Sequence, residues 1–173
     1  MMSLQSDDFE LFGLQHQFSQ ERTQLDARWK DLQREAHPDK FSAQGSAAQR
    51  VAMQWSVRIN EAYQRLKDPL KRAAYLCEIN GHPVNAENNT AMQADFLMQQ
   101  MQWRETLDEA TGSADLSELQ SAVHQSRQAY LESLAHLIDV DHNFSEAVAQ
   151  VRALMFIERF VRDVEQKFDQ IET

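Results

Sequence analysis

Apolar residues recur every three or four positions along most of the chain, which is the spacing of amphipathic helices. One stripe predicts a helix over residues 20–36, capped by Ser19, and consists of Leu25, Trp29, Leu32 and Ala36. A second stripe predicts a helix over residues 47–66 and consists of Val51, Trp55, Ile59, Ala62 and Leu66. The connection between them is short, so the two stripes are expected to face each other in an antiparallel helical hairpin.

The same periodicity and the helix-capping residues predict helices in the rest of the chain. Asp7 and Asp8 can cap a short helix that ends near Gly13, and Asp68-Pro69 starts a helix that runs to about residue 80. Further patterns cover residues 91–110, 116–138 and 144–171. No strand pattern stands out, so the predicted fold class is all-α.

The predicted helices fall into two groups, separated by a stretch rich in Asn, Gly and Pro. This stretch, residues 81–90, is the best candidate for a linker. It divides the chain into an amino-terminal domain over residues 1–80 and a carboxy-terminal domain over residues 91–173. The three helices of the second domain have short connections, which favours an antiparallel three-helix bundle.

Composition narrows the classes of partner. The formal net charge of −10 argues against nucleic-acid binding, which needs a basic surface. The only cysteine, Cys77, excludes an internal disulfide and a multi-cysteine zinc module, and fits a reducing compartment. No long apolar run and no signal-peptide pattern is present. The chain is therefore expected to be cytoplasmic and not to bind membranes.

The turn between the first two long helices carries His37-Pro38-Asp39. Pro38 lacks an amide hydrogen and disfavours helical geometry at the residue before it, so the first helix should end near Ala36. An imidazole and a carboxylate are then placed side by side at an exposed tip. From the tripeptide alone, the turn can be an ordinary helix connection or a binding site.

The flanks of this turn carry a family resemblance. Phe12-Gly13-Leu14, the turn itself, Asn60-Glu61-Ala62-Tyr63 and Asp68-Pro69-Leu70 follow one another as in J-domains, and the similarity covers roughly residues 7–77. The resemblance implies a domain that docks on a DnaK-type chaperone and stimulates its ATPase. It assigns the chaperone-binding surface to His37, Pro38 and Asp39, with Lys30 and Arg34 beside them.

The helix that opens the second domain has two sets of apolar residues. Phe96, Trp103 and Leu107 share one face, which is enough to dock the helix on its neighbours. A second set, Leu97, Met98 and Met101, lies well round from that face. Either the helix is buried on two sides, or it displays an apolar patch that suits protein docking. The pattern alone leaves both readings open.

The order of a J-domain, a linker and a bundle opening with Phe96-Leu97-Met98 and Trp103-Arg104-Glu105 resembles the HscB family of co-chaperones of iron–sulfur cluster assembly. The lone cysteine fits its bacterial form, because eukaryotic members can carry an amino-terminal cysteine pair. The resemblance implies that the J-domain engages the chaperone HscA and the bundle binds the scaffold protein IscU. The implied scaffold-binding residues are Leu97, Met98, Met101, Arg104, Glu105 and Phe156. Gln102, at the margin, stands where an acidic residue is expected.

No catalytic residues, metal ligands or cofactors are expected. His124, His136 and His142 lack the spacing of metal ligands, and glycine-rich phosphate loops are absent. Two alternatives remain. One is a general J-domain protein whose bundle serves oligomerisation or unfolded clients. The other is a helical enzyme that uses His37 and Asp39 as an acid–base pair, which would need a deep pocket beside them.

Overall fold

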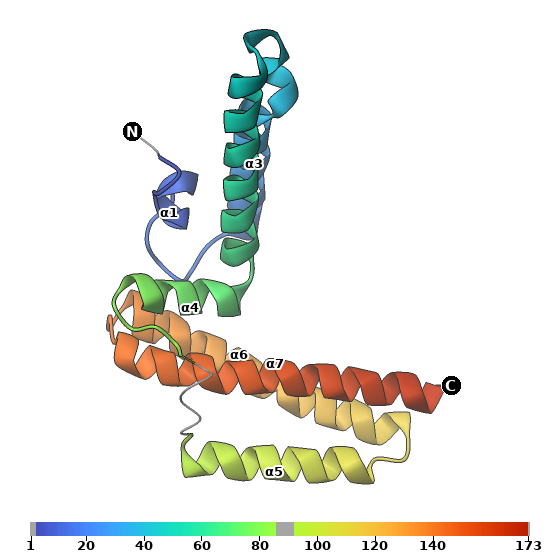
Figure 1. Ribbon diagram of the computed structural model, residues 1–173. Coiled ribbons are helices and arrows are strands. Elements are labelled where there is room, and N and C mark those ends of the chain that lie inside the picture. Colours follow the sequence, from blue (N-terminus) through green and yellow to red (C-terminus); the bar gives the residue numbers. More distant parts are fainter. Residues whose placement is uncertain (1–2, 86–91, 173) are drawn as a thin grey trace. The chain divides into compact units, whose positions relative to one another are not determined.

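The computed structural model describes residues 3–85 and 92–172, and within these ranges it contains helices and no strand, which confirms the all-α prediction (Figure 1). The chain divides into two compact units, Met1–Leu76 and Cys77–Thr173. The helices are α1 (Asp8–Phe12), α2 (Arg22–Ala36), the 3-10 helix η1 (Pro38–Gln44), α3 (Ser46–Lys67), α4 (Pro69–Ile79), α5 (Ala94–Glu109), α6 (Ser113–Asp139) and α7 (Phe144–Glu172).

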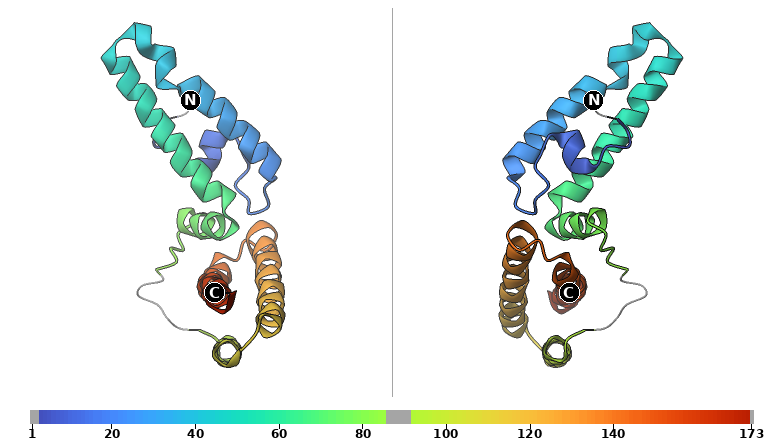
Figure 2. Two further views of the ribbon diagram at one scale, coloured as in Figure 1. Left: turned by 90° about the vertical axis from the view of Figure 1, so that its right-hand side faces the viewer. Right: turned by 90° about the vertical axis from the view of Figure 1, so that its left-hand side faces the viewer.

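In the first unit, α2 and α3 run antiparallel and η1 joins them at the tip of the hairpin, as both views in Figure 2 show. The predicted stripes form most of the seam, and the indole of Trp29 stacks on the ring of Tyr63 with 4.6 Å between centroids. The buried residues of the seam include Leu25, Leu32, Ile59, Ala62 and Leu66. At the tip the prediction is wrong, because Val51 is 52% exposed.

Some of the capping residues predicted from the sequence lie at the observed helix ends, and others do not. Asp7 caps α1, since its Oδ1 accepts the Glu10 amide at 2.8 Å. Gly13 ends α1 in the left-handed region at φ 63°, and a Cβ there would lie 2.7 Å from the Arg28 guanidinium. The predicted cap Ser19 is wrong. Instead, α2 begins at Arg22, and Glu21 at its cap position makes no side-chain capping bond.

A buried carboxylate ties α1 to α3. Asp8 is 0% exposed and lies between two guanidinium groups, with its oxygens 2.8 Å from Arg58 Nη2 and 2.6 Å from Arg65 Nε. The amide of Asp8 donates to the Tyr75 hydroxyl of α4 at 3.1 Å. A buried charge persists only when it is paired, so this network fixes the position of the short α1.

In the second unit, α6 and α7 form a long antiparallel pair and α5 packs on both, as the end-on view in Figure 2 shows. The bundle-facing residues of α5 are the predicted Phe96, Trp103 and Leu107, all buried. The Trp103 indole stacks on the Phe160 ring of α7, with 5.7 Å between centroids. The three-helix bundle predicted from the sequence is therefore present.

The predicted linker is only partly within the described residues, because residues 86–91 lie outside them. Before this gap, His82 stacks on the Phe144 ring at 6.3 Å, and Arg152 Nε donates to the Val84 carbonyl at 3.0 Å. Residues 82–84 thus lie against α7. A domain boundary inside residues 81–90 stays a prediction.

Over the described ranges, none of the helices combines the length and the apolar character that crossing a bilayer requires.

The Asp8 network makes a stability prediction. Asp8→Asn should lower the free energy of unfolding by about 3 kcal/mol, because it leaves two arginines facing a neutral amide in a buried place. Urea unfolding followed by circular dichroism measures the change. The exposed Asp31 of α2 provides the control, and Asp31→Asn should change stability by less than about 0.5 kcal/mol. Equal effects of the two substitutions would contradict the assignment.

Candidate functional site

Pro38 sets the geometry of the His-Pro-Asp turn, which consists of His37, Pro38 and Asp39. His37 ends α2 in an extended conformation, at φ −63° and ψ 129°, as expected for a residue before proline. The Ser56 hydroxyl of α3 donates to the Ala36 carbonyl at 3.4 Å, and Gln33 Nε2 donates to the Ser56 carbonyl at 3.3 Å. These bonds join the end of α2 to α3.

The side chains of this turn are open to solvent. The exposed fraction is 58% for the His37 side chain and 92% for that of Asp39. The Asp39 amide donates to His37 Nδ1 at 3.2 Å, which leaves the proton of a neutral ring on Nε2. The Asp39 carboxylate lies 3.7 Å from the same Nδ1. Both side chains are therefore accessible to another molecule.

Lys30 and Arg34 lie on the exposed side of α2. Arg34 is 3.6 Å from Asp31, but both side chains are more than half exposed, so this ion pair is weak. The cation of Arg34 is consequently available to a stronger partner. Lys30 and Arg34 are therefore exposed on the second half of the helix that ends at the His-Pro-Asp turn.

An apolar groove of about 460 Å³ opens near the tip of the hairpin. It is lined by Leu11, Leu32, Glu35, Ala36, Phe41, Gln44, Ala48, Val51, Ala52, Trp55 and Ile59. The groove explains the exposure of Val51, because the two helices do not close over that residue. Neither His37 nor Asp39 belongs to its lining, so the groove does not place a bound molecule between an acid and a base.

The second candidate surface is the outer face of α5, where the structure decides between the two readings of the pattern. The exposed fraction is 47% for Leu97, 61% for Met98 and 71% for Met101. These three residues, called the α5 patch below, line one shallow depression together with Gln102, Arg104, Glu105 and Asp108. Large apolar side chains at this exposure are typical of docking surfaces.

Phe156 of α7 reaches α5 next to this patch. Its ring is 37% exposed and meets the Phe96 ring edge to face, with 6.4 Å between centroids. Phe156 therefore contacts α5 at Phe96, the residue that precedes the first member of the α5 patch in the sequence. The guanidinium of Arg159 lies over the Phe156 ring at 5.5 Å from its centroid. Nothing in the sequence pattern singled out Arg159.

The polar residues predicted for this surface differ in their surroundings. Glu105 and Gln102 are exposed on α5. The Arg104 side chain is 51% exposed; its Nη2 donates to Asp163 Oδ2 of α7 at 2.9 Å and its guanidinium lies over the Phe160 ring at 5.1 Å. Arg104 thus ties α5 to α7, a role that the sequence did not suggest.

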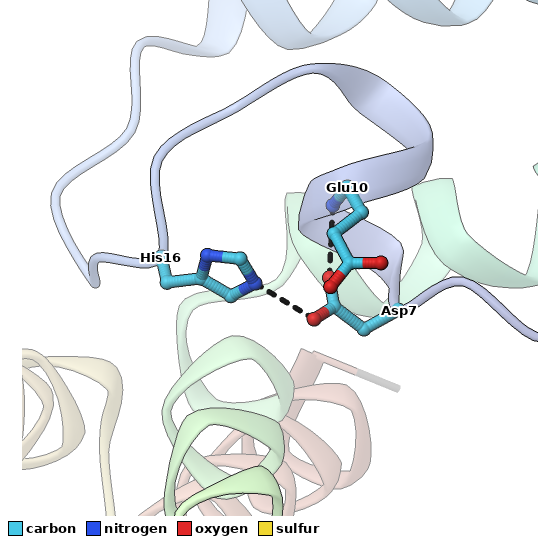
Figure 3. A group of neighbouring side chains, drawn as sticks. All are labelled: Asp7, Glu10 and His16. Carbon is cyan, nitrogen blue, oxygen red and sulfur yellow. Dashed lines mark hydrogen bonds and ion pairs between the residues drawn. The ribbon is translucent and has the colours of Figure 1, made fainter. Parts of the chain in front are cut away.

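One group of side chains has the composition of a metal site. Figure 3 shows Asp7, Glu10 and His16, whose possible ligand atoms lie within 4.8 Å of one another. His16 Nε2 lies 2.7 Å from Asp7 Oδ2, while the other oxygen of Asp7 caps α1. A structural role, tethering the loop after α1, accounts for these contacts. The sequence pattern does not reveal this group, because a turn, and not a regular spacing, brings His16 back to Asp7.

Cys77 carries no sign of reactivity. Its side chain is buried, and burial raises the pKa of the thiol to about 11. The thiolate that nucleophilic or metal-binding chemistry needs is therefore scarce near neutral pH.

Comparison with known proteins gives one consistent result. Residues 92–165 match the family described as the HSCB C-terminal oligomerisation domain. The chain is 45% identical over 175 residues to the co-chaperone protein HscB homolog of Burkholderia thailandensis, covering 99% of both chains. It is 44% identical over 176 residues to the homolog of Burkholderia multivorans, covering 100% of both.

Solved structures agree with these relatives. Chaperone HscB from Vibrio cholerae superposes with a TM-score of 0.82 at 34% identity, covering 96% of this chain and 99% of that one. The human co-chaperone protein HscB superposes with a TM-score of 0.90 at 25% identity, covering 96% of this chain and 84% of that one. The likeness therefore extends over both units.

The contacts of Asp7 predict a dependence of stability on pH. Although partial burial opposes the shift, the bonds from the Glu10 amide and the His16 ring hold the pKa of Asp7 below its ordinary value of 3.8. A lowered carboxyl pKa stabilises the fold above the ordinary pKa, and this stabilisation is lost as the pH falls through the lowered value. Asp7→Asn should therefore cost about 0.5 kcal/mol at pH 6, and this cost should shrink as the pH falls below 3.8.

Thermal unfolding between pH 6 and pH 2.5 measures this difference. Glu132→Gln, at an exposed carboxyl in the middle of α6, is the control and should follow the unmodified chain at each pH. A difference between Asp7→Asn and the unmodified chain that stays constant with pH would contradict the prediction.

Proposed function

Because the chain belongs to the HscB family of co-chaperones, we propose that it stimulates the ATPase of a DnaK-type chaperone, HscA, and delivers the iron–sulfur scaffold protein IscU to it. The first unit contacts the chaperone and the second binds the scaffold. The chain itself needs no catalytic group, because hydrolysis takes place on the chaperone. The single observation that carries the proposal is that each unit exposes a separate surface of the expected kind.

The first of these surfaces is the His-Pro-Asp turn. His37 and Asp39 are exposed and joined to a firmly packed hairpin, so they are held ready for contact. Asp39 can form a charge-assisted bond with a cation of the chaperone, while Lys30 and Arg34 attract acidic groups during the encounter. The apolar lining of the nearby groove, which includes neither His37 nor Asp39, supports a contact role over an enzymatic one.

The second surface is the α5 patch with Phe156. Four exposed apolar side chains within one bundle suit the centre of a protein interface, where a few anchors supply most of the binding energy. Glu105 at the edge of the patch adds a charge that favours one orientation of the scaffold.

The alternative function for the bundle is self-association, which the name of the matched C-terminal family favours. An apolar patch can serve a second copy of the chain as well as a scaffold. Sedimentation equilibrium separates the two readings. A monomer that becomes a 1:1 complex on adding scaffold supports delivery, and a dimer that scaffold does not dissociate supports self-association.

We also propose that the protein acts in the cytoplasm. A single buried cysteine with a raised pKa fits a reducing compartment, where no disulfide is required.

Replacing His37 tests the chaperone-binding surface. His37→Gln should reduce stimulation of the HscA ATPase at least about tenfold while scaffold affinity stays within twofold, because the two surfaces lie in different units. Steady-state ATP hydrolysis and calorimetric titration give the two readouts. His124→Gln, at an exposed histidine of α6, is the control and should leave both values unchanged. Full stimulation by His37→Gln would remove the turn from the proposal.

Truncating the α5 patch tests the scaffold-binding surface. The combination Leu97→Ala, Met98→Ala and Met101→Ala should weaken scaffold affinity at least about tenfold, as expected for apolar interface anchors. The melting temperature should change little, because all three side chains are exposed. Val140→Ala, at an apolar residue that is 63% exposed elsewhere in the bundle, is the matched control. Unchanged affinity of the triple variant would refute delivery through this surface.

A further inference from the structure

The cations near the α5 patch are not equally available. Arg104 pairs with Asp163, and Arg127 pairs with Glu158 at 2.5 Å. Both carboxylates lie on α7 within four residues of Arg159, so they are already neutralised by other arginines. Among the residues that the structure describes, Arg159 forms no ion pair, and its side chain is exposed. The charge of Arg159, whose guanidinium lies over the Phe156 ring, is therefore not neutralised by a carboxylate of the described residues.

The position of Arg159 is also restricted. Its guanidinium lies over the Phe156 ring, 5.5 Å from the centroid, and Phe156 is packed on Phe96. A guanidinium held over an aromatic ring loses less conformational entropy when it binds than a freely moving one. The charge is thus presented at the edge of the apolar surface, and its planar fork matches a carboxylate.

The opposite end of the patch has the opposite charge. Glu105, Asp108 and Glu109 of α5 are exposed and line the same depression as Met101. The surface therefore has an apolar centre, with carboxylates and the half-exposed Arg104 towards the end of α5 and the guanidinium of Arg159 over the Phe156 ring. A docked protein with complementary charges can satisfy this arrangement in only one orientation.

We propose that Arg159 binds a carboxylate of the scaffold protein and so orients the scaffold on the α5 patch, whereas Arg104 acts within the bundle. The proposal rests on the function proposed above. The partner it specifies is a folded protein that places an acidic side chain next to an apolar contact. On a chain with a net charge of −10, such an acidic group is repelled by most of the surface, so a local cation selects where it binds.

The test is a set of calorimetric titrations of the full chain with IscU-type scaffold, at 50 mM and at 500 mM salt. Arg159→Gln should weaken binding about fivefold at low salt and by less than about twofold at high salt, because salt screens an exposed ion pair. Arg159→Lys keeps the charge but loses the planar fork, and should recover only part of the affinity. Arg50→Gln removes the same charge from an exposed residue of α3 and is the control, expected to stay within twofold.

Arg104→Gln separates the two roles. It should lower the melting temperature of the bundle, because it breaks the link to Asp163, and should weaken scaffold binding less than Arg159→Gln does. The proposal is overturned if Arg159→Gln binds like Arg50→Gln, or if its loss of affinity is the same at both salt concentrations. Failure of the proposed function looks different, since the triple α5 variant would then bind scaffold as tightly as the unmodified chain.

Discussion

The pyrrolidine ring of Pro38 is the constraint on which the first unit depends, because it removes an amide hydrogen and clashes with the residue before it. It ends α2 at Ala36, holds His37 in extended geometry and starts the 3-10 turn that leads into α3. The antiparallel seam then fixes where this turn lies, because Ser56 and Gln33 tie the end of α2 to α3. An exposed imidazole and carboxylate are consequently supported by a packed hairpin and not by a free loop.

Much of this architecture could be predicted from the sequence, because helix-forming patterns are local. The predicted span of residues 47–66 differs from α3 (Ser46–Lys67) by one residue at each end, and the predicted start at residue 144 is that of α7. The errors arise where tertiary contacts determine the burial of a residue or the start of a helix. Val51 has the right spacing for the seam, but a groove separates the helices at that point. Ser19 is a suitable cap by type, but the chain enters α2 at Glu21.

The candidate binding surface of the bundle also could be predicted from the sequence only in part. Periodicity separated Leu97, Met98 and Met101 from the packed face of α5, but only the structure showed that these residues are exposed. The sequence could not predict which carboxylate each arginine binds, because the ion pairs between α5, α6 and α7 join residues that are 31 and 59 positions apart. Arg104 belongs to a family pattern and forms an exposed ion pair with Asp163 of α7, while Arg159 belongs to no recognised pattern and lies over the Phe156 ring.

The division into two units has a consequence for how the surfaces can act together. Each surface is supported by packing within its own unit, the seam of α2 and α3 in one and the α5 contacts with α6 and α7 in the other. Substitutions on the two surfaces affect packing in different units, so their energetic effects are expected to add. A chain that holds chaperone and scaffold at once raises their effective concentration for each other without any contact between the two surfaces. This effective concentration depends on the length and stiffness of the segment that joins the two surfaces. Each surface could then change in evolution without disturbing the other.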